Sequence, residues 1–132
     1  MKNPEMRNEL LDYLFSLSDF NYQKNCWVKG NCPPNIQHDE FDYSVHFLFD
    51  DTDLANNPDG LIGYILNDAN EALLIKSVCE KITAIFNKYG TDLSDEQYIN
   101  LSEWEEVIRS AKSAYDTLSS TPKMVLSSKL EN

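Results

Sequence analysis

Apolar residues recur every three or four positions near the start of the chain, which is the spacing of one buried helical face. The residues that share this face are Met6, Leu10, Tyr13, Leu14 and Leu17. Asn3 is a suitable N-cap, and Pro4 suits a first helical turn because its missing N–H has no partner there in any case. The pattern predicts a helix that begins at Pro4 and ends near Asp19.

A second apolar stripe follows Asp68 and is the strongest helical pattern in the chain. Its members are Ile75, Val78, Cys79, Ile82, Ile85, Phe86 and Tyr89. Asp68 and Glu71 have the spacing of a capping box, in which each side chain accepts the other residue's amide proton. Gly90 supplies the left-handed residue that ends many helices. We therefore predict a helix between Asp68 and Gly90.

A third stripe has the same helical spacing and lies near the end of the chain. Its members are Trp104, Val107, Ile108, Ala111, Tyr115 and Leu118. Ser102 and Glu105 suggest a second capping box before it, and we expect a short helix over residues 94–99. From residue 119 onward Ser, Thr, Pro and Lys dominate, so we predict a poorly ordered tail over residues 119–132.

Residues 39–51 fit both a strand and a helix. Aromatic and apolar residues alternate with polar ones from Phe41 to Phe49, as in a half-buried strand. Phe41, Val45 and Leu48 also have helical spacing. A lone strand would lack a hydrogen-bonding partner, and no second strand is clear elsewhere, so we favour a helix.

The remaining segments are punctuated by turn residues. Residues 20–38 contain Gly30, Pro33 and Pro34 and are interpreted as a loop anchored by Trp27. A turn is expected over residues 56–60, followed by a short buried segment of undetermined type.

Together these elements predict a mostly α fold. We expect a single globular domain over residues 1–118, built as a helical bundle of about 4–6 helices. If residues 41–50 form a strand, the class becomes α+β. A chain of 132 residues buries enough apolar surface to need neither disulfides nor metal for folding.

The charge of the chain is acidic and unevenly distributed. It has 11 Lys and Arg residues against 22 Asp and Glu residues, a net charge of −11. Residues 39–59 contain seven acidic residues and no Lys or Arg, and residues 92–116 contain seven against Arg109 and Lys112. Such charge repels nucleic acid and anionic membranes and attracts basic proteins. We therefore expect no nucleic-acid partner and no membrane partner.

Compartment and cysteine chemistry follow from what the sequence lacks. No apolar run approaches the ~20 residues of a membrane span, and the first residues do not form a signal peptide. The expected location is the cytoplasm, so we predict free thiols at Cys26, Cys32 and Cys79.

No pattern of metal ligands or catalytic residues stands out. Cys26, Cys32 and His38 are spaced too widely for a typical structural zinc site. An EF-hand loop with Gly60 at its sixth position would need ligands where Ala55 and Leu66 stand. His46 beside Asp50 or Asp51 is the one acid/base candidate, and no nucleophile accompanies it. We predict no enzyme activity, no catalytic residue, no metal and no cofactor.

A protein-binding surface is the remaining function class. The predicted partner-binding residues are Asp50, Asp51, Asp53, Glu103, Trp104, Glu106 and Trp27. The acids would attract a basic partner, and the two tryptophans are candidate anchors because Trp is enriched among residues that dominate binding energy. Packing in the core is the alternative for both tryptophans.

Several strings resemble a family of small acidic bacterial proteins without assigned activity. They are the segments 46–52, 61–66, 89–95 and 103–104, and the resemblance covers residues 27–118. Small acidic proteins of this kind are often immunity proteins, which block a toxin in the cell that produces it; this step is an analogy of size, charge and setting. The resemblance implies a non-catalytic protein that neutralises a cognate, basic toxin, with a nuclease as a fitting example. The alternative is a cytoplasmic regulatory or adaptor protein of unknown partner. The sequence predicts no oligomeric state.

Overall fold

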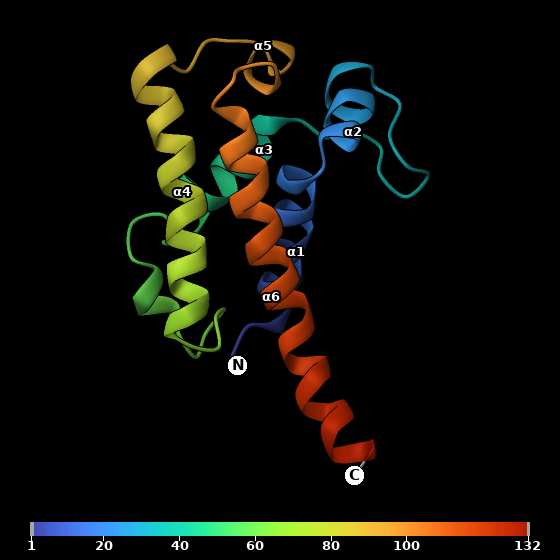
Figure 1. Ribbon diagram of the computed structural model, residues 1–132, viewed down its shortest axis with the longest axis vertical. Helices are drawn as coiled ribbons and strands as arrows, with labels where there is room; N and C mark the ends of the chain where they lie inside the picture. Colours follow the sequence, from blue (N-terminus) through green and yellow to red (C-terminus); the bar gives the residue numbers. More distant parts are fainter. Residues whose placement is uncertain (1, 132) are drawn as a thin grey trace.

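Three long helices lie side by side and carry the core (Figure 1). They are α1 (Pro4–Ser18), α4 (Ala69–Tyr89) and α6 (Trp104–Glu131), and α6 packs against both α1 and α4. The computed structural model describes residues 2–131, with side chains described for residues 2–120. The prediction of one mostly α domain is confirmed.

Local signals place the first two long helices as the sequence predicts. Asn3 caps α1, where its Oδ1 accepts the N–H of Met6 at 3.0 Å. Asp68 caps α4, where its Oδ1 accepts the N–H of Glu71 at 2.9 Å. Gly90 ends α4 with φ 84°, a conformation that favours glycine. Both predicted helices are therefore confirmed.

The predicted loop over residues 20–38 is wrong in its first half. α2 (Phe20–Tyr22) and the π-helix η1 (Gln23–Val28) follow α1 directly. Asp19 accepts the N–H of Tyr22 at 3.0 Å and so starts the new helix. The buried side chains of Cys26 and Trp27 hold η1 on the core. The irregular segment comprises residues 29–40, which project from the bundle beside α2 (Figure 1).

The ambiguous segment is helical, so the strand alternative is wrong. α3 (Phe41–His46) continues into the π-helix η2 (Phe47–Asp51). The Oδ2 of Asp95, at the start of α5 (Asp95–Ile99), accepts the N–H of Phe41 at 3.1 Å. A cap from a segment 54 residues away is invisible to local pattern, which explains the ambiguity.

Shorter elements complete the described chain. The 3₁₀ helix η3 (Pro58–Leu61) occupies the predicted turn, and an isolated bridge joins Ile62 to Leu66. Residues 2–131 contain no strand. Among these residues, no helix is long and apolar enough to cross a membrane.

Near the end of the chain, the helix caps differ in part from those that the sequence predicts. A capping box forms between Ser94 and Gln97 at the start of α5, which confirms the short predicted helix. The box predicted between Ser102 and Glu105 does not form, because Ser102 Oγ donates to Glu103 Oε1 instead, at 3.0 Å. The tail predicted over residues 119–132 lies largely outside the residues whose side chains are described, so it stays a prediction.

Candidate binding cleft

A cleft of about 610 Å³ lies between α1 and the loop that follows η1. Its polar lining includes three carboxylates, those of Glu9, Asp12 and Asp39, and no Lys or Arg side chain. Its aromatic lining consists of Tyr13, Phe15, Tyr22, Tyr43 and Tyr115. Phe15 and Tyr43 are exposed. The arrangement offers acidic groups and aromatic faces together, which is the chemistry that binds cationic side chains.

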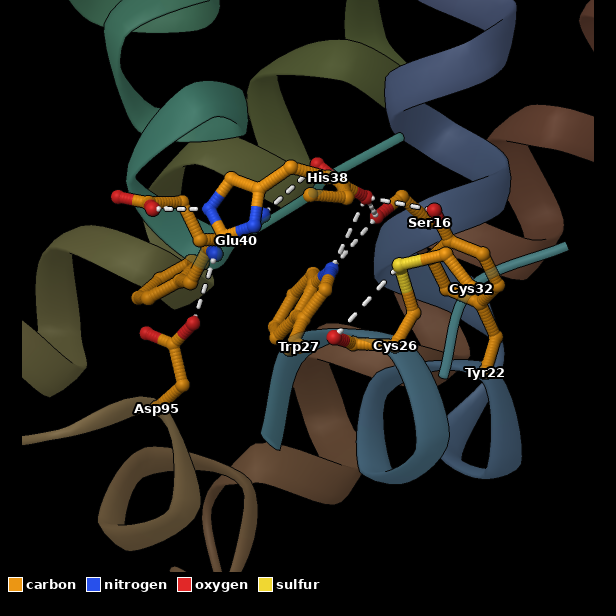
Figure 2. The surroundings of a disulfide bond; sticks show 10 residues. Ser16, Tyr22, Cys26, Trp27, Cys32, His38, Glu40 and Asp95 are labelled. Atoms are coloured by element: carbon orange, nitrogen blue, oxygen red, sulfur yellow. Dashed lines mark hydrogen bonds and ion pairs between the residues drawn. A yellow bond between two sulfur atoms is a disulfide. The ribbon is translucent and has the colours of Figure 1, made fainter. Parts of the chain in front are cut away.

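Asp39 lines the cleft and is buried, and its carboxylate accepts hydrogen bonds from three side chains. Its Oδ2 lies 2.8 Å from Ser16 Oγ, 2.8 Å from the hydroxyl of Tyr22 and 3.0 Å from Trp27 Nε1. Figure 2 shows the Trp27 indole directed toward this network. Its Oδ1 also accepts the N–H of Glu40 at 2.9 Å. These donors stabilise a carboxylate that has no basic partner among the side chains that the structure describes.

Burial and nearby carboxylates raise the pKa values of two tyrosines that line the cleft. Burial, followed by the hydrogen bond to Asp39, raises the pKa of Tyr22 above its ordinary value. Burial also raises the pKa of Tyr13, and the neighbouring carboxylates of Glu9, Asp39, Asp51 and Asp12 raise it further. Asp51 therefore acts on the same ring as the acids of α1.

The predicted binding residues Asp50, Asp51 and Asp53 are all exposed. Asp50 lies 2.7 Å from Nδ1 of His46, and Asp42 lies 3.2 Å from Nε2 of the same ring. Within the described chain, Asp51 and Asp53 make no ion pair, and Asp53 accepts a long hydrogen bond of 3.5 Å from Asn56. The structure thus leaves Asp51 and Asp53 available to a partner.

Glu103 and Glu106 are already paired with Lys or Arg side chains, unlike Asp51 and Asp53. Glu103 lies 2.6 Å from Lys88 Nζ, and this hydrogen bond is the main reason that the pKa of Glu103 falls to about 2. Arg109 pairs with Glu106 at 3.2 Å and with Glu105 at 3.0 Å. These pairs neutralise much of the second acidic segment, so we omit Glu103 and Glu106 from the proposed binding surface.

Trp27 and Trp104 are core residues, which corrects their prediction as exposed anchors. Their exposed fractions are 7% and 1%. Both rings pack on Phe41, with centroids 5.7 Å and 4.9 Å away. Trp104 Nε1 also donates to the buried Oε1 of Gln23 at 2.8 Å. A partner cannot contact either indole without disturbing this aromatic cluster.

Cys26 and Cys32 form a disulfide, so the prediction of free thiols is wrong for this pair (Figure 2). The chain reverses after η1 through Gly30, whose φ of 76° favours glycine, and the Cα atoms of the two cysteines lie 4.3 Å apart. The amino-acid composition of the segment does not predict that the chain brings these two cysteines together. Cys79 is free and buried on the apolar face of α4, as its place in the stripe predicts.

Sequence reasoning missed most of the cleft. The helical spacing places Tyr13 on the buried face of the first helix, whereas its side chain is half-buried and also lines the cleft. Glu9 and Asp12 lie within residues 1–38, where the acidic residues are balanced by an equal number of Lys and Arg residues, so the sequence shows no charge cluster there. The signal that was present is their spacing of three residues, which places both on one side of a helix.

Comparison with known proteins gives one match. A family model described as a domain of unknown function matches residues 1–124, which include every residue that lines the cleft. No curated protein and no solved structure matches the chain.

Proposed function

The chain belongs to the family DUF7945, a domain of unknown function, and from that premise we propose that it is a non-catalytic protein that binds a basic protein partner. More specifically, it is an immunity protein that neutralises a cognate bacterial toxin by covering a basic active-site surface. A nuclease toxin fits this description because its active site must attract a phosphate backbone. The proposed location is the cytoplasm.

The observation that supports this proposal is the unbalanced charge of the cleft. Glu9 and Asp12 line the cleft and form no ion pair within the described chain, while most acids of the second segment do. A merely solvated acidic face would carry mixed or paired charges. A cleft with carboxylates and no Lys or Arg raises the local concentration of a cationic partner.

Two physical steps account for binding. Complementary charge speeds the encounter, since opposed potentials orient the partners before contact. The exposed rings of Phe15 and Tyr43 then provide apolar area and aromatic faces on which a Lys or Arg side chain packs. The acidic surface occupies the place that nucleic acid would take on a nuclease.

The test begins with affinity capture on the purified protein, followed by association kinetics with the captured basic protein. We expect the association rate to fall steeply as ionic strength rises. The double variant Glu9→Gln/Asp12→Asn should associate about tenfold more slowly at low salt. Co-expression with the captured toxin should then no longer protect the cell.

The matched control is Glu105→Gln/Glu106→Gln, which changes the net charge by the same amount on α6. Its carboxylates already pair with Arg109, so the association rate should stay within about twofold of wild type. A rate insensitive to salt, or equal effects of the two double variants, would contradict the role of the cleft. Capture of an uncharged or acidic partner alone would favour the regulatory or adaptor alternative.

A further inference from the structure

Residues 33–38 form the loop wall of the cleft. A disulfide attaches the chain at Cys32, and few hydrogen bonds hold the wall itself. Within residues 33–37 there is a single hydrogen bond, from the N–H of Ile36 to the carbonyl of Pro33 at 2.9 Å. In the described chain, no hydrogen bond joins residues 33–37 to any other segment. Between Asn31 and His38, the Cys32 side of the disulfide is therefore the only bonded tether, aided by the partly buried Ile36.

The two ends of this wall are held differently. Asp39 anchors one end through Ser16, Tyr22 and Trp27, which belong to α1, α2 and η1. The other end is held by the disulfide to Cys26, which is 1% exposed within η1, and by the hydrogen bond from the N–H of Asn31 to the carbonyl of Asn25 at 2.8 Å. Figure 2 shows the disulfide that joins Cys26 of η1 to Cys32. Loss of the sulfur–sulfur bond would remove the attachment at Cys32, so that residues 33–38 would be held only through the Asn31 hydrogen bond on one side and the Asp39 network on the other.

We propose that the Cys26–Cys32 disulfide is a redox-sensitive clasp that holds residues 33–38 as the wall of the cleft. Reduction releases this wall and opens the cleft, while the helical core stays folded. This goes beyond partner binding, because it concerns the shape of the cleft itself and applies whatever protein occupies it.

The reducing agent is a dithiol, and the exchange begins at the more accessible sulfur. Cys32 is half-buried whereas Cys26 is buried, so a reductant thiolate attacks Cys32 Sγ and Cys26 leaves as a thiolate that takes up a proton. The second thiol of the reductant attacks the mixed disulfide and releases Cys32. Two protein thiols form, and the reductant is oxidised to its own disulfide.

Hydrogen–deuterium exchange of the full chain, with and without dithiothreitol, tests the clasp. The amides of Lys29, Gly30, Asn31 and Ile36 donate hydrogen bonds, and we expect their exchange to quicken about tenfold or more on reduction, because local opening governs the exchange of bonded amides. Exchange within α1 and α4 should stay unchanged. No partner protein is needed, so failure of this experiment is independent of the proposed function.

Two variants control for the identity of the thiols. Cys26→Ser/Cys32→Ser should exchange like the reduced protein and ignore dithiothreitol. Cys79→Ala should keep the full response, since the Cys79 thiol is free and buried. The proposal is overturned if exchange over residues 29–38 is unaffected, or if exchange rises throughout α1 and α4, which would make the disulfide a staple of the whole fold. Free Cys26 and Cys32 in air-oxidised protein would overturn it equally.

Discussion

The guanidinium of Arg7 and the carboxylate of Glu71 form a bidentate ion pair inside the core, with N–O distances of 2.8 and 2.9 Å. The two residues are 6% and 1% exposed. Arg7 also donates to the carbonyls of Ile65 and Leu118, at 2.9 and 3.0 Å. One charged pair thereby joins α1, α4 and α6 and the segment that precedes α4.

We expect Glu71→Ala to lower the free energy of unfolding by about 3–5 kcal/mol, because it leaves the Arg7 charge buried without a counter-charge. Urea denaturation measures this directly. The control is the double variant Arg7→Met/Glu71→Leu, which removes both charges and should recover much of the loss. A cost below about 1 kcal/mol for Glu71→Ala would mean that water reaches the Arg7 guanidinium.

Trp104 gives a second test of the core. Trp104→Phe keeps the apolar bulk and removes the N–H that serves Gln23 Oε1, leaving a buried acceptor unpaired. We expect a loss of about 1–3 kcal/mol in unfolding free energy. Association with a basic partner should not change once the protein is folded. A stable variant that loses partner binding would restore Trp104 as an interface residue.

The sequence predicts the long helices well because their signals are local. Asn3, Asp68 and Gly90 each act within one helical turn, and the apolar stripes repeat at the period of the helix. Where the prediction was wrong or ambiguous, long-range contacts determine the local structure. The cap that Asp95 gives Phe41 is one example. The Glu71 carboxylate is another, because it turns to Arg7 rather than completing a capping box with Asp68.

The candidate site was less predictable for a similar reason. Charge counting finds the segment with Asp51 and Asp53, which the structure leaves unpaired with any base in the described chain. It cannot find Glu9 and Asp12, because Lys and Arg residues nearby in the sequence bring the net charge of that segment to zero. In the folded chain, no Lys or Arg side chain lines the cleft beside them. It also cannot reveal that Glu103 is paired with Lys88, and Glu105 and Glu106 with Arg109. Net charge by segment is therefore a poor guide to surface potential.

The disulfide should also contribute to global stability. It closes a short loop with a sequence separation of 6, and restricting so short a loop in the unfolded chain contributes about 2 kcal/mol. We expect Cys26→Ser/Cys32→Ser to lose about this amount in urea denaturation and to stay folded. Wild-type protein measured in dithiothreitol should match the variant. A loss above about 5 kcal/mol, or an unfolded variant, would show that the pair is essential to the fold.

His46 provides the last prediction, which concerns pH. Its exposed ring lies between two carboxylates on one helical face, and Asp42 first, then the hydrogen bond to Asp50, raise its pKa above 6.5. Because the folded pKa is raised, this contribution to stability is fully present below the unfolded value and is lost as pH rises through the folded pKa. It is small, since water screens exposed pairs.

Titration of the His46 ring by NMR measures this shift directly. Asp42→Asn and Asp50→Asn should each lower the pKa of His46, because the charge of Asp42 and the hydrogen bond and charge of Asp50 all raise it. Glu105→Gln is the matched control, since that carboxylate pairs with Arg109 and is not among the groups that act on His46. Protonation of His46 also offsets part of the charge of Asp42 and Asp50. A basic partner that approaches this face should therefore associate more slowly below the pKa of His46 than above it. An unchanged pKa in Asp42→Asn would show that the two side chains do not form the pair in solution.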